Sequence, residues 1–225
     1  SDEEMKEWLT SNKPNWGSKW QAGDVKYKDL TGEGEVTPGA STLENHGDLK
    51  RIGNNSPRYR VGLNLDAAWK GIDFSIFFQG VLKRDWMFDA GDPYFWGAGS
   101  GMWQAACFEE HMDYWTPENT DAYYPKPYFN ETKNQQAQDA YMQKASYLRC
   151  KNIQLGYTLP THITEKAGIS NCRIYLSCDN LFTITGLSSV YDPEAFGSYD
   201  GYGTSGKTYP LQRTISVGVI FKFVN

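Results

Sequence analysis

Five segments of roughly 10–13 residues alternate apolar and polar side chains, and this pattern constrains the fold more than any other feature of the chain. Alternation with a period of two predicts β-strands whose two faces meet different surroundings. The segments are 58–69, 74–83, 147–159, 172–182 and 211–223. They are longer than the common strand of about 5–6 residues, and they match the ~9–11 residues of a tilted strand that crosses a bilayer.

The polar faces of these segments carry charged side chains in the middle of a strand, such as Asp66 and Arg173. A water-filled barrel lumen permits such charges, while lipid accepts the apolar face. Aromatic residues such as Trp69, Tyr147 and Phe223 stand at the ends of the segments. Aromatic residues of membrane barrels gather at the two membrane interfaces in the same way. The sequence therefore predicts strands that cross a membrane.

The connections between the segments alternate between long and short. Residues 1–57 precede the first segment, a tight turn at 70–73 follows it, and 84–146 separate the second segment from the third. Residues 160–171 and then 183–210 make the last two connections. Outer-membrane barrels have short periplasmic turns and long extracellular loops. With the C-terminus in the periplasm, every short connection would be periplasmic and every long one extracellular.

The expected fold is all-β, an antiparallel transmembrane β-barrel segment with long extracellular loops. Residues 1–57 would form an extracellular loop region with an acidic turn, and 58–225 the C-terminal barrel strands with the long loops 84–146 and 183–210. Five strands cannot close a lipid-exposed barrel, because an open edge would leave backbone groups unpaired in hydrocarbon. The chain also shows no signal-peptide pattern and begins with Ser1 rather than Met. We therefore expect it to be a piece of a larger protein.

Composition excludes some classes of function and favours others. The net charge of −5 and the absence of a basic stripe argue against binding of nucleic acid. Aromatic residues make up 15% of the 225 residues, which favours an all-β protein or a sugar-handling surface. The cysteines show no C-x-x-C spacing, so neither a zinc site nor a redox site is predicted. Cys172 and Cys178 would be small buried or lipid-facing residues, and a disulfide that involves Cys107 stays open.

Motifs of a known family follow one another along nearly the whole chain. Three of them are AGDVKYKD at 22–29, YWTPENTDA at 114–122 and LGYTLP at 155–160. The others lie at 32–34, 51–53, 57–59, 69–74, 78–80, 146–149, 180–183, 192–194 and 209–210, and the final strand completes the set. With these motifs the chain resembles the C-terminal end of SusC/RagA-type TonB-dependent outer-membrane transporters.

The resemblance implies a barrel of about 22 strands with an N-terminal plug, of which this chain would supply the last five strands. It also implies import of glycans or peptides across the outer membrane of a Gram-negative bacterium. The implied partners are the rest of the barrel and the plug, a SusD-type surface lipoprotein, the glycan or peptide substrate and outer-membrane lipid. The TonB complex would act through the N-terminal part that this chain lacks.

The long loop 84–146 is rich in aromatic residues, and a short polar helix is expected within it over 131–144. Aromatic faces stack on sugars, so some of these side chains could contact substrate. The candidates for substrate contact are Trp86, Tyr94, Trp96 and Trp103. They could instead pack the loop itself or contact the lipoprotein. The alternative function is a soluble carbohydrate-binding β-domain that uses this tryptophan-rich loop, and it would need a second sheet to cover the apolar strand faces.

An acidic stretch resembles the start of an EF-hand loop. Oxygen-bearing side chains recur along it, and glycines between them permit a sharp turn, as a Ca²⁺ site requires. The candidate ligands are Asp24, Asp29, Thr31, Glu33 and Glu35. Ala40 stands where an EF-hand loop has its bidentate glutamate. The two alternatives for this stretch are therefore a Ca²⁺ site and an acidic turn that binds no metal ion.

Enzymatic activity is not predicted. The histidines His46, His111 and His162 are scattered through loops, so they suggest no paired site or triad. Asp192 and Glu194 are close in sequence but belong to a family-like turn, and a glycosidase pair needs a shaped cleft. A secreted glycan hydrolase fragment would therefore lack a defensible set of catalytic residues.

Overall fold

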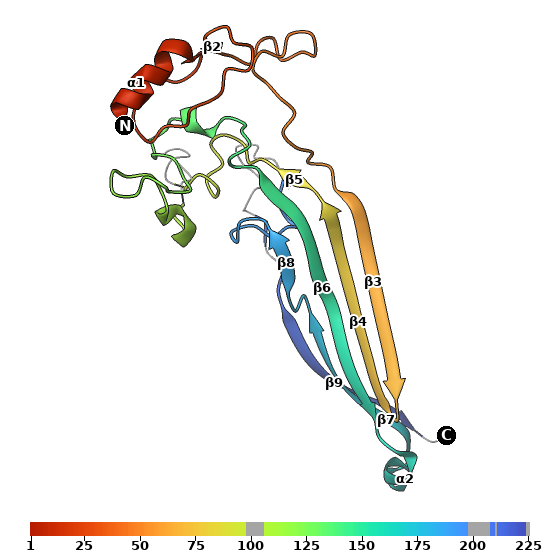
Figure 1. Ribbon diagram of the computed structural model, residues 1–225. Helices are drawn as coiled ribbons and strands as arrows, with labels where there is room; N and C mark the ends of the chain where they lie inside the picture. Colours follow the sequence, from red (N-terminus) through yellow and green to blue (C-terminus); the bar gives the residue numbers. More distant parts are fainter. Residues whose placement is uncertain (98–105, 198–207, 210, 224–225) are drawn as a thin grey trace. The chain divides into compact units, whose positions relative to one another are not determined.

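The computed structural model describes residues 1–97, 106–197, 208–209 and 211–223 (Figure 1). Trp103, a candidate for substrate contact, lies outside this part of the chain. The chain divides into two compact units. The first, here called the loop unit, includes Ser1–Gly53 and Met87–Met142. The second, the sheet unit, includes Asn54–Trp86, Gln143–Phe196 and Thr208–Asn225.

The sheet unit is built on five long antiparallel strands in the order β3-β4-β6-β7-β9. They are β3 Arg58–Trp69, β4 Ile72–Lys83, β6 Gln143–Thr158, β7 Ile169–Asp179 and β9 Thr214–Phe223. Two short strands, β5 Asp85–Trp86 and β8 Thr183–Gly186, also pair with β6. Among the described residues, β3 and β9 each pair on one side only. The prediction of an all-β, antiparallel fold is confirmed.

The register aligns apolar residues with apolar residues across the whole sheet. One row runs from β3 to β9 through Leu65, Ile76, Ile153, Cys178 and Ile215. The next row of this face is Ala67, Phe74, Leu155, Leu176 and Val217. A row of the other face contains Asp66, Ser75, Gln154, Ser177 and Ser216. The sheet therefore has one apolar face and one polar face, as the period-two alternation predicts.

A β-bulge on β6 keeps apolar residues of this strand on the apolar face of the sheet on both sides of the bulge. The register between β4 and β6 shifts at Phe77 and Phe78, because Phe77 pairs with Asn152 while Phe78 pairs with Cys150. Lys151 is the extra residue of β6 at this point. The alternation therefore restarts, and Cys150 joins the apolar face beside Phe78.

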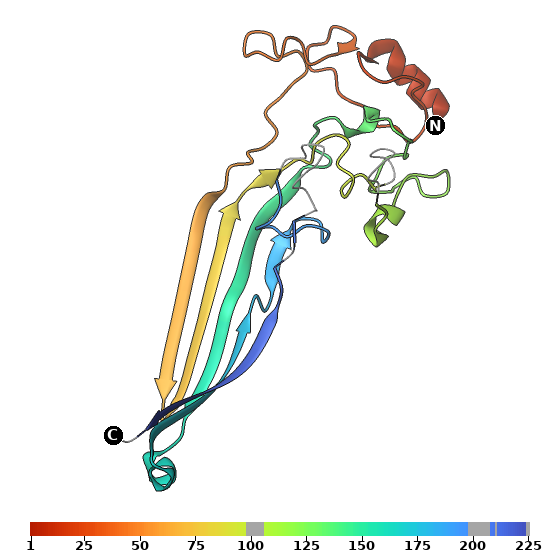
Figure 2. The same cartoon turned by 180° about the vertical axis from the view of Figure 1, so that it is seen from behind.

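The short connections lie together at one end of the sheet (Figures 1 and 2). Lys70 and Gly71 form the two-residue turn between β3 and β4, with φ of 47° and 88°. Two successive positive φ angles are the mark of a type I′ hairpin turn. At the same end, α2 Thr161–Thr164 and a 3₁₀ turn at Glu165–Ala167 join β6 to β7. The long connections leave the sheet at its opposite end.

The loop unit contains little regular structure. Its elements are α1 Asp2–Ser11, β1 Lys13–Pro14, β2 Glu35–Val36, η2 Glu109–Met112 and η3 Lys133–Gln135. Sequence analysis did not predict α1, which Ser1 and Glu4 cap reciprocally. The prediction of a helix over 131–144 is wrong, because only the single 3₁₀ turn η3 forms there. The Gln138 side-chain amide donates a hydrogen bond to the Asn134 carbonyl. In an α-helix, this carbonyl would instead accept from a backbone N–H. No helix in the described part of the chain is long and apolar enough to cross a membrane.

Candidate functional site

The polar face of the sheet unit holds a network across three strands near the end that carries α2. Arg173 Nε on β7 donates to Asp73 Oδ1 on β4 at 2.9 Å. Its Nη2 donates to Gln154 Oε1 on β6 at 2.8 Å and also to the Asp73 carboxylate. The Arg173 guanidinium therefore lies over β6, the strand between its own and that of Asp73.

Glycines make room for large side chains on this face. A Cβ atom at Gly156 would lie 2.5 Å from Asp73 Oδ1 and 2.6 Å from Arg173 Nε. A Cβ atom at Gly218 would likewise lie 2.5 Å from Cε1 of Tyr175. Real Cβ atoms do not come this close to other atoms, so a side chain at either position would force its neighbour to move. These two glycines therefore let the side chains of Arg173 and Tyr175 lie flat against the sheet.

A second charged cluster lies on the polar face toward the opposite end. Arg149 is 4% exposed, and its Nη2 donates to Asp192 Oδ1 at 2.8 Å. Its Nε donates to Thr183 Oγ1 at 2.7 Å. Lys151 Nζ donates to Glu194 Oε2 at 3.0 Å. Asp192 and Glu194 therefore hold the segment after β8 on β6.

Trp86, the first of the candidate substrate contacts, is buried in the sheet unit. Its ring meets Phe196 edge to face with 4.9 Å between the centroids. The Arg84 guanidinium lies over both rings, at 4.8 Å from Trp86 and 4.5 Å from Phe196. Only 8% of the Trp86 surface is exposed, so its ring packs against neighbouring side chains of the sheet unit in this structure.

Trp96 and Tyr94 belong to an aromatic cluster of the loop unit. Trp96 is 6% exposed, and its indole N–H donates to the Asp89 carbonyl at 3.0 Å. It meets Tyr141 edge to face at 5.0 Å, while Tyr94 stacks on Phe108 at 5.7 Å. Both side chains pack within the loop in this structure, and their contact with substrate stays a prediction.

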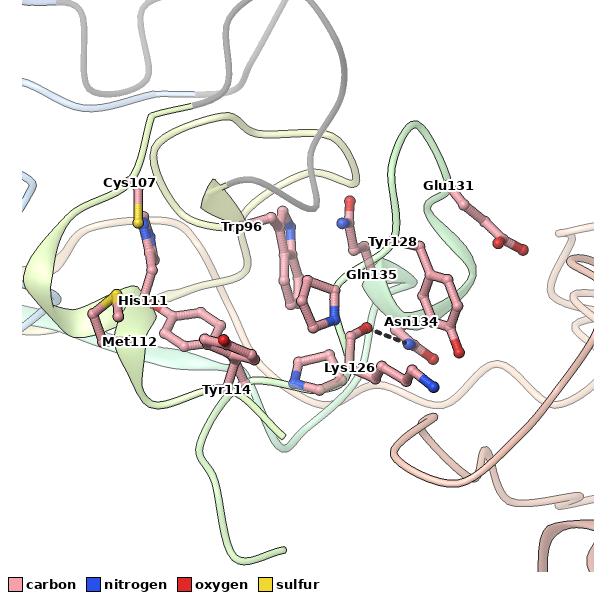
Figure 3. A pocket seen from close by; sticks show the side chains of 13 residues that line it. Trp96, Cys107, His111, Met112, Tyr114, Lys126, Tyr128, Glu131, Asn134 and Gln135 are labelled. Atoms are coloured by element: carbon pink, nitrogen blue, oxygen red, sulfur yellow. Dashed lines mark hydrogen bonds between the residues drawn. The ribbon is translucent and has the colours of Figure 1, made fainter. Parts of the chain in front are cut away.

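Beside this cluster the loop unit encloses a pocket of about 340 Å³ (Figure 3). Trp96, Tyr114, Tyr124 and Tyr128 supply aromatic walls, and two prolines add further apolar surface. The polar groups at the pocket include His111, Lys126, Glu131 and Asn134. Pockets of roughly 300–1,000 Å³ that combine apolar walls with a few polar groups are typical of small-ligand sites.

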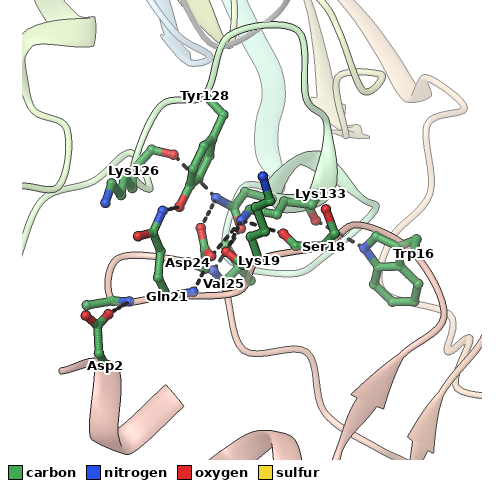
Figure 4. Close-up of polar contacts among 12 residues, drawn as sticks. Asp2, Trp16, Ser18, Lys19, Gln21, Asp24, Val25, Lys126, Tyr128 and Lys133 are labelled. Atoms are coloured by element: carbon green, nitrogen blue, oxygen red, sulfur yellow. Dashed lines mark hydrogen bonds and ion pairs between the residues drawn. The ribbon is translucent and has the colours of Figure 1, made fainter. Parts of the chain in front are cut away.

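A buried ion pair anchors the segment 16–27 to the segment 126–138 (Figure 4). Lys133 Nζ lies 2.9 Å from Asp24 Oδ2, and the two side chains are 1% and 0% exposed. The ammonium group also donates to the Ser18 and Lys19 carbonyls at 3.2 Å, and it lies 3.9 Å from the centre of the Tyr128 ring. The charge of Lys133 is therefore compensated on several sides, as a buried charge requires.

Tyrosine hydroxyls complete this anchor. Tyr27 donates its hydroxyl hydrogen to the Lys133 carbonyl at 2.9 Å. The hydroxyl of Tyr128 accepts from Gln21 Nε2 at 2.7 Å. Burial raises the pKa of both phenols above the ordinary value, so both keep their proton at neutral pH.

The acidic turn is held together by hydrogen bonds from its own backbone. Asp29 accepts from the N–H groups of Gly34 and Gly32 at 2.8 and 2.6 Å, and these donors lower the pKa of the Asp29 carboxyl. Thr31 Oγ1 donates to Asp29 and to Asp48, while Glu33 and Glu35 are exposed. Asp24 is in the ion pair with Lys133. Within the described ranges, no group of three or more His, Cys, Asp or Glu side chains is placed to hold a metal ion. The Ca²⁺ hypothesis stays a prediction.

The pocket brings together residues that sequence analysis did not group. His111 was set aside as a scattered loop histidine, and Lys126 was not singled out. The YWTPENTDA motif at 114–122 and the AGDVKYKD motif at 22–29 pack together, since a Cβ at Gly23 would lie 2.5 Å from Cδ2 of Trp115. The backbone N–H of Lys126 donates to the Gly23 carbonyl at 2.9 Å. Tyr114 of the first motif lines the pocket, so that motif is a sequence signal for the pocket.

Comparisons with curated proteins point to one family. The chain is 30% identical over 208 residues to the TonB-dependent receptor P3 of Formosa agariphila, and 26% identical over 208 residues to the TonB-dependent receptor P26 of the same organism. Both matches cover 89% of this chain, but only 19% and 20% of the relatives. The chain thus spans about a fifth of the length of the curated relatives that it matches. No protein-family model matches it.

Comparisons with solved structures agree. The RagAB peptide importer in its open-open state matches with a TM-score of 0.56 and 29% identity, over 75% of this chain and 17% of that one. A structure of the RagAB peptide transporter matches with a TM-score of 0.53 and 29% identity, over 74% of this chain and 17% of that one. The motifs, the two-faced sheet and these similarities identify the chain as part of a SusC/RagA-type TonB-dependent receptor.

Proposed function

We propose that this chain supplies strands and long loops to the barrel of an outer-membrane transporter that imports oligomeric nutrients with energy delivered through TonB. The observation that carries the proposal is the register of the sheet, which aligns apolar rows on one face and polar rows on the other over five long strands. Lipid would cover the apolar face, and the polar face would line a watery passage. The relatives are named receptors and importers, which supports transport rather than catalysis.

The open edges support the same proposal. Leu65 and Leu176 on the apolar face are 50% and 49% exposed, and the edge strands β3 and β9 have no second neighbour among the described strands. In a membrane, each backbone N–H and C=O of such an edge needs a partner. Further strands of a complete barrel would pair with both edges. The alternative of a soluble carbohydrate-binding domain requires a second layer over the apolar face, and the described strands form none.

The proposed location is the outer membrane of a Gram-negative bacterium, with the α2 end of the sheet in the periplasm and the long connections outside. On intact cells, added protease is expected to cut within 84–142 and to leave 159–168 uncut, because only the first stretch would reach the medium. The measurement is immunoblotting of tagged protein before and after the outer membrane is permeabilised. Cleavage at 159–168 on intact cells, with protection of 84–142, would overturn the orientation.

Peptides are the proposed cargo in preference to glycans, and a SusD-type surface lipoprotein is the proposed partner. The importers of similar structure are named for peptides. Trp86, which the sequence offered as a candidate for stacking on sugar, has its ring buried against Phe196 and Arg84. A peptide cargo would use backbone donors and acceptors along the polar face, with less need for exposed aromatic planes.

The test is uptake by cells that carry the complete protein. Cells are expected to accumulate a fluorescent pentapeptide, and this uptake should fall to background when the protein is deleted or when a proton uncoupler removes the energy source. Fluorescent maltohexaose serves as the glycan probe. Accumulation of maltohexaose alone would reverse the cargo assignment, and unchanged accumulation of both probes after deletion would refute the transport function.

A further inference from the structure

Arg84, which lies between β4 and β5, holds its guanidinium group in a fixed orientation. The guanidinium carbon is 4.8 Å from the centre of the Trp86 ring and 4.5 Å from that of Phe196. Its Nε donates to the Asn55 carbonyl at 3.0 Å. The backbone is held as well, because the Ala145 N–H donates to the Arg84 carbonyl at 2.9 Å. A group that is ordered before its ligand arrives loses less entropy on binding.

The two terminal nitrogens of this guanidinium group are available to a ligand. Neither Nη1 nor Nη2 of Arg84 has a hydrogen-bond or ion-pair partner among the described residues, and neither atom is fully buried. A carboxylate pairs with a guanidinium through two parallel N–H bonds. Because Nε already donates to Asn55, the edge formed by Nη1 and Nη2 remains for such a pair.

Arg60 and Tyr147 lie near this edge on the polar face of the sheet. The register pairs Arg60 on β3 with Val81 on β4, and Val81 with Tyr147 on β6. Burial lowers the pKa of Arg84 and the charge of Arg60 lowers it further, while the Tyr147 phenol also interacts with the Arg84 charge. Tyr147 is 8% exposed, yet its hydroxyl is not fully buried and makes no hydrogen bond within the described ranges. This hydroxyl is therefore a second available donor.

Further positive charge surrounds these residues. Arg58 on β3 is paired directly with Lys83 on β4, and like charges in opposite positions destabilise a sheet. In the part of the chain that the structure describes, no carboxylate forms an ion pair with either side chain. An anion bound at this end of the sheet would reduce the repulsion.

The carboxylates at the same end leave this charge largely uncompensated. Asp192 and Glu194 pair with Arg149 and Lys151, so that cluster is neutral by itself. Asp85 accepts a backbone N–H at 3.1 Å and forms no ion pair among the described residues. Its single charge stands against the four cations of the two preceding paragraphs. The potential here therefore attracts anions.

We propose that Arg84, Arg60 and Tyr147 form a site for a carboxylate group of the cargo. Nη1 and Nη2 of Arg84 would donate to the two carboxylate oxygens, the Tyr147 hydroxyl would donate to one of them, and Arg60 would add a second positive charge. These donors replace the water that a carboxylate loses on binding. The site rests on the proposed function in one respect, namely that cargo passes along the polar face.

The test is calorimetric titration of the complete protein in detergent with two peptides whose ends are blocked. Acetyl-Ala-Glu-Leu-Glu-Ala-amide carries two carboxylates, and acetyl-Ala-Gln-Leu-Gln-Ala-amide has the same shape without them. Wild-type protein is expected to bind the glutamate peptide about ten-fold or more tightly than the glutamine peptide. The ratio of the two Kd values reports recognition of charge, and a general loosening of the sheet would not change it.

Three variants remove the proposed contacts one at a time. Arg84→Gln should bring the two Kd values together, and Tyr147→Phe, which removes only the hydroxyl, should weaken binding of the glutamate peptide about three- to ten-fold. Arg60→Gln should weaken it about two- to five-fold, because Arg60 is exposed. The control Lys222→Gln removes an exposed lysine at the far end of β9 and should leave both Kd values unchanged.

Arg84→Lys separates the two-bond contact from simple charge attraction. It keeps the positive charge but loses the fork of two N–H donors, so the preference for the glutamate peptide should become smaller without disappearing. Equal affinity of the wild-type protein for both peptides would overturn the site, as would a preference that persists unchanged in Arg84→Gln. Hexagalacturonate tests a glycan as the source of the carboxylate. Binding of this glycan alone, lost in Arg84→Gln, would support the site and reverse the choice of peptide cargo.

Uptake by cells keeps this site distinct from the proposed function. If cells import the glutamine peptide in a deletion-sensitive way while the titration shows no preference for carboxylate, the transport function stands and the site fails. If cells import none of the probes while the titration shows a preference that depends on Arg84, the transport function fails and the site stands.

Discussion

Replacing Leu176 with arginine is expected to prevent assembly of the complete protein in the outer membrane, whereas arginine at the neighbouring Ser177 is expected to be tolerated. Leu176 lies on the apolar face between Leu155 and Val217, and Ser177 lies on the polar face between Gln154 and Ser216. An arginine on the lipid side of a barrel costs about 2–4 kcal/mol near the bilayer midplane, which shifts the folding equilibrium by roughly 30- to 900-fold.

The measurement is the folded, heat-modifiable band of the protein in outer-membrane fractions. It should be strongly reduced for Leu176→Arg and retained for Ser177→Arg. Because the two positions are adjacent in the same strand, the pair controls for expression, strand propensity and added charge. Equal assembly of both variants would show that lipid does not cover this face.

The second large effect is expected from Lys133→Met in the loop unit. The change leaves the Asp24 carboxylate, which is 0% exposed, without its cation. Breaking a buried ion pair by removing one partner costs about 3–5 kcal/mol, because an uncompensated charge stays buried. The segment 16–27 should then detach from 126–138 while the sheet unit remains assembled.

Hydrogen exchange followed by mass spectrometry measures this detachment. The N–H groups of Gln21 and Val25, which donate to Asp24 and Asn134, should exchange faster in Lys133→Met. The double variant Asp24→Asn/Lys133→Met removes both charges, keeps a side-chain oxygen that can accept from the Gln21 N–H, and should recover most of the protection. The control Lys19→Met changes an exposed lysine of the same segment whose carbonyl, not its side chain, contacts Lys133. Unchanged exchange in Lys133→Met would mean that the ion pair does not hold the two segments together.

The faces of the long strands could be predicted from sequence because alternation is a local property. Adjacent residues such as Leu176 and Ser177 point to opposite faces wherever a strand is regular, so the predicted faces agree with the observed register. The bulge at Lys151 could not be predicted, because it depends on pairing with β4 rather than on the residues of β6 alone. Strand β8, at Thr183–Gly186, was missed since four residues show too little alternation.

The loop unit was less predictable because long-range contacts decide its structure. Asp24 was grouped with Asp29 on spacing, yet its carboxylate lies against Lys133, far along the chain. Trp86 and Trp96 were selected for their chemistry, and nothing local indicates that Phe196 and Tyr141 cover them. His111 and Lys126 gain their significance from the pocket, which forms only when distant segments pack.

Gly156 and Gly218 place no side chain on the polar face of the sheet, so the side chains of Arg173 and Tyr175 lie directly against the backbone there. A side chain at either position would push a long polar group away from the wall and into the proposed passage. A passing cargo would then meet projecting side chains with their own rotamer freedom, instead of a smooth surface that presents the flat faces of the guanidinium and the phenol. Under the proposed function, the two glycines would therefore set the clearance of the passage, and the width available to cargo would depend on residues that the cargo does not touch.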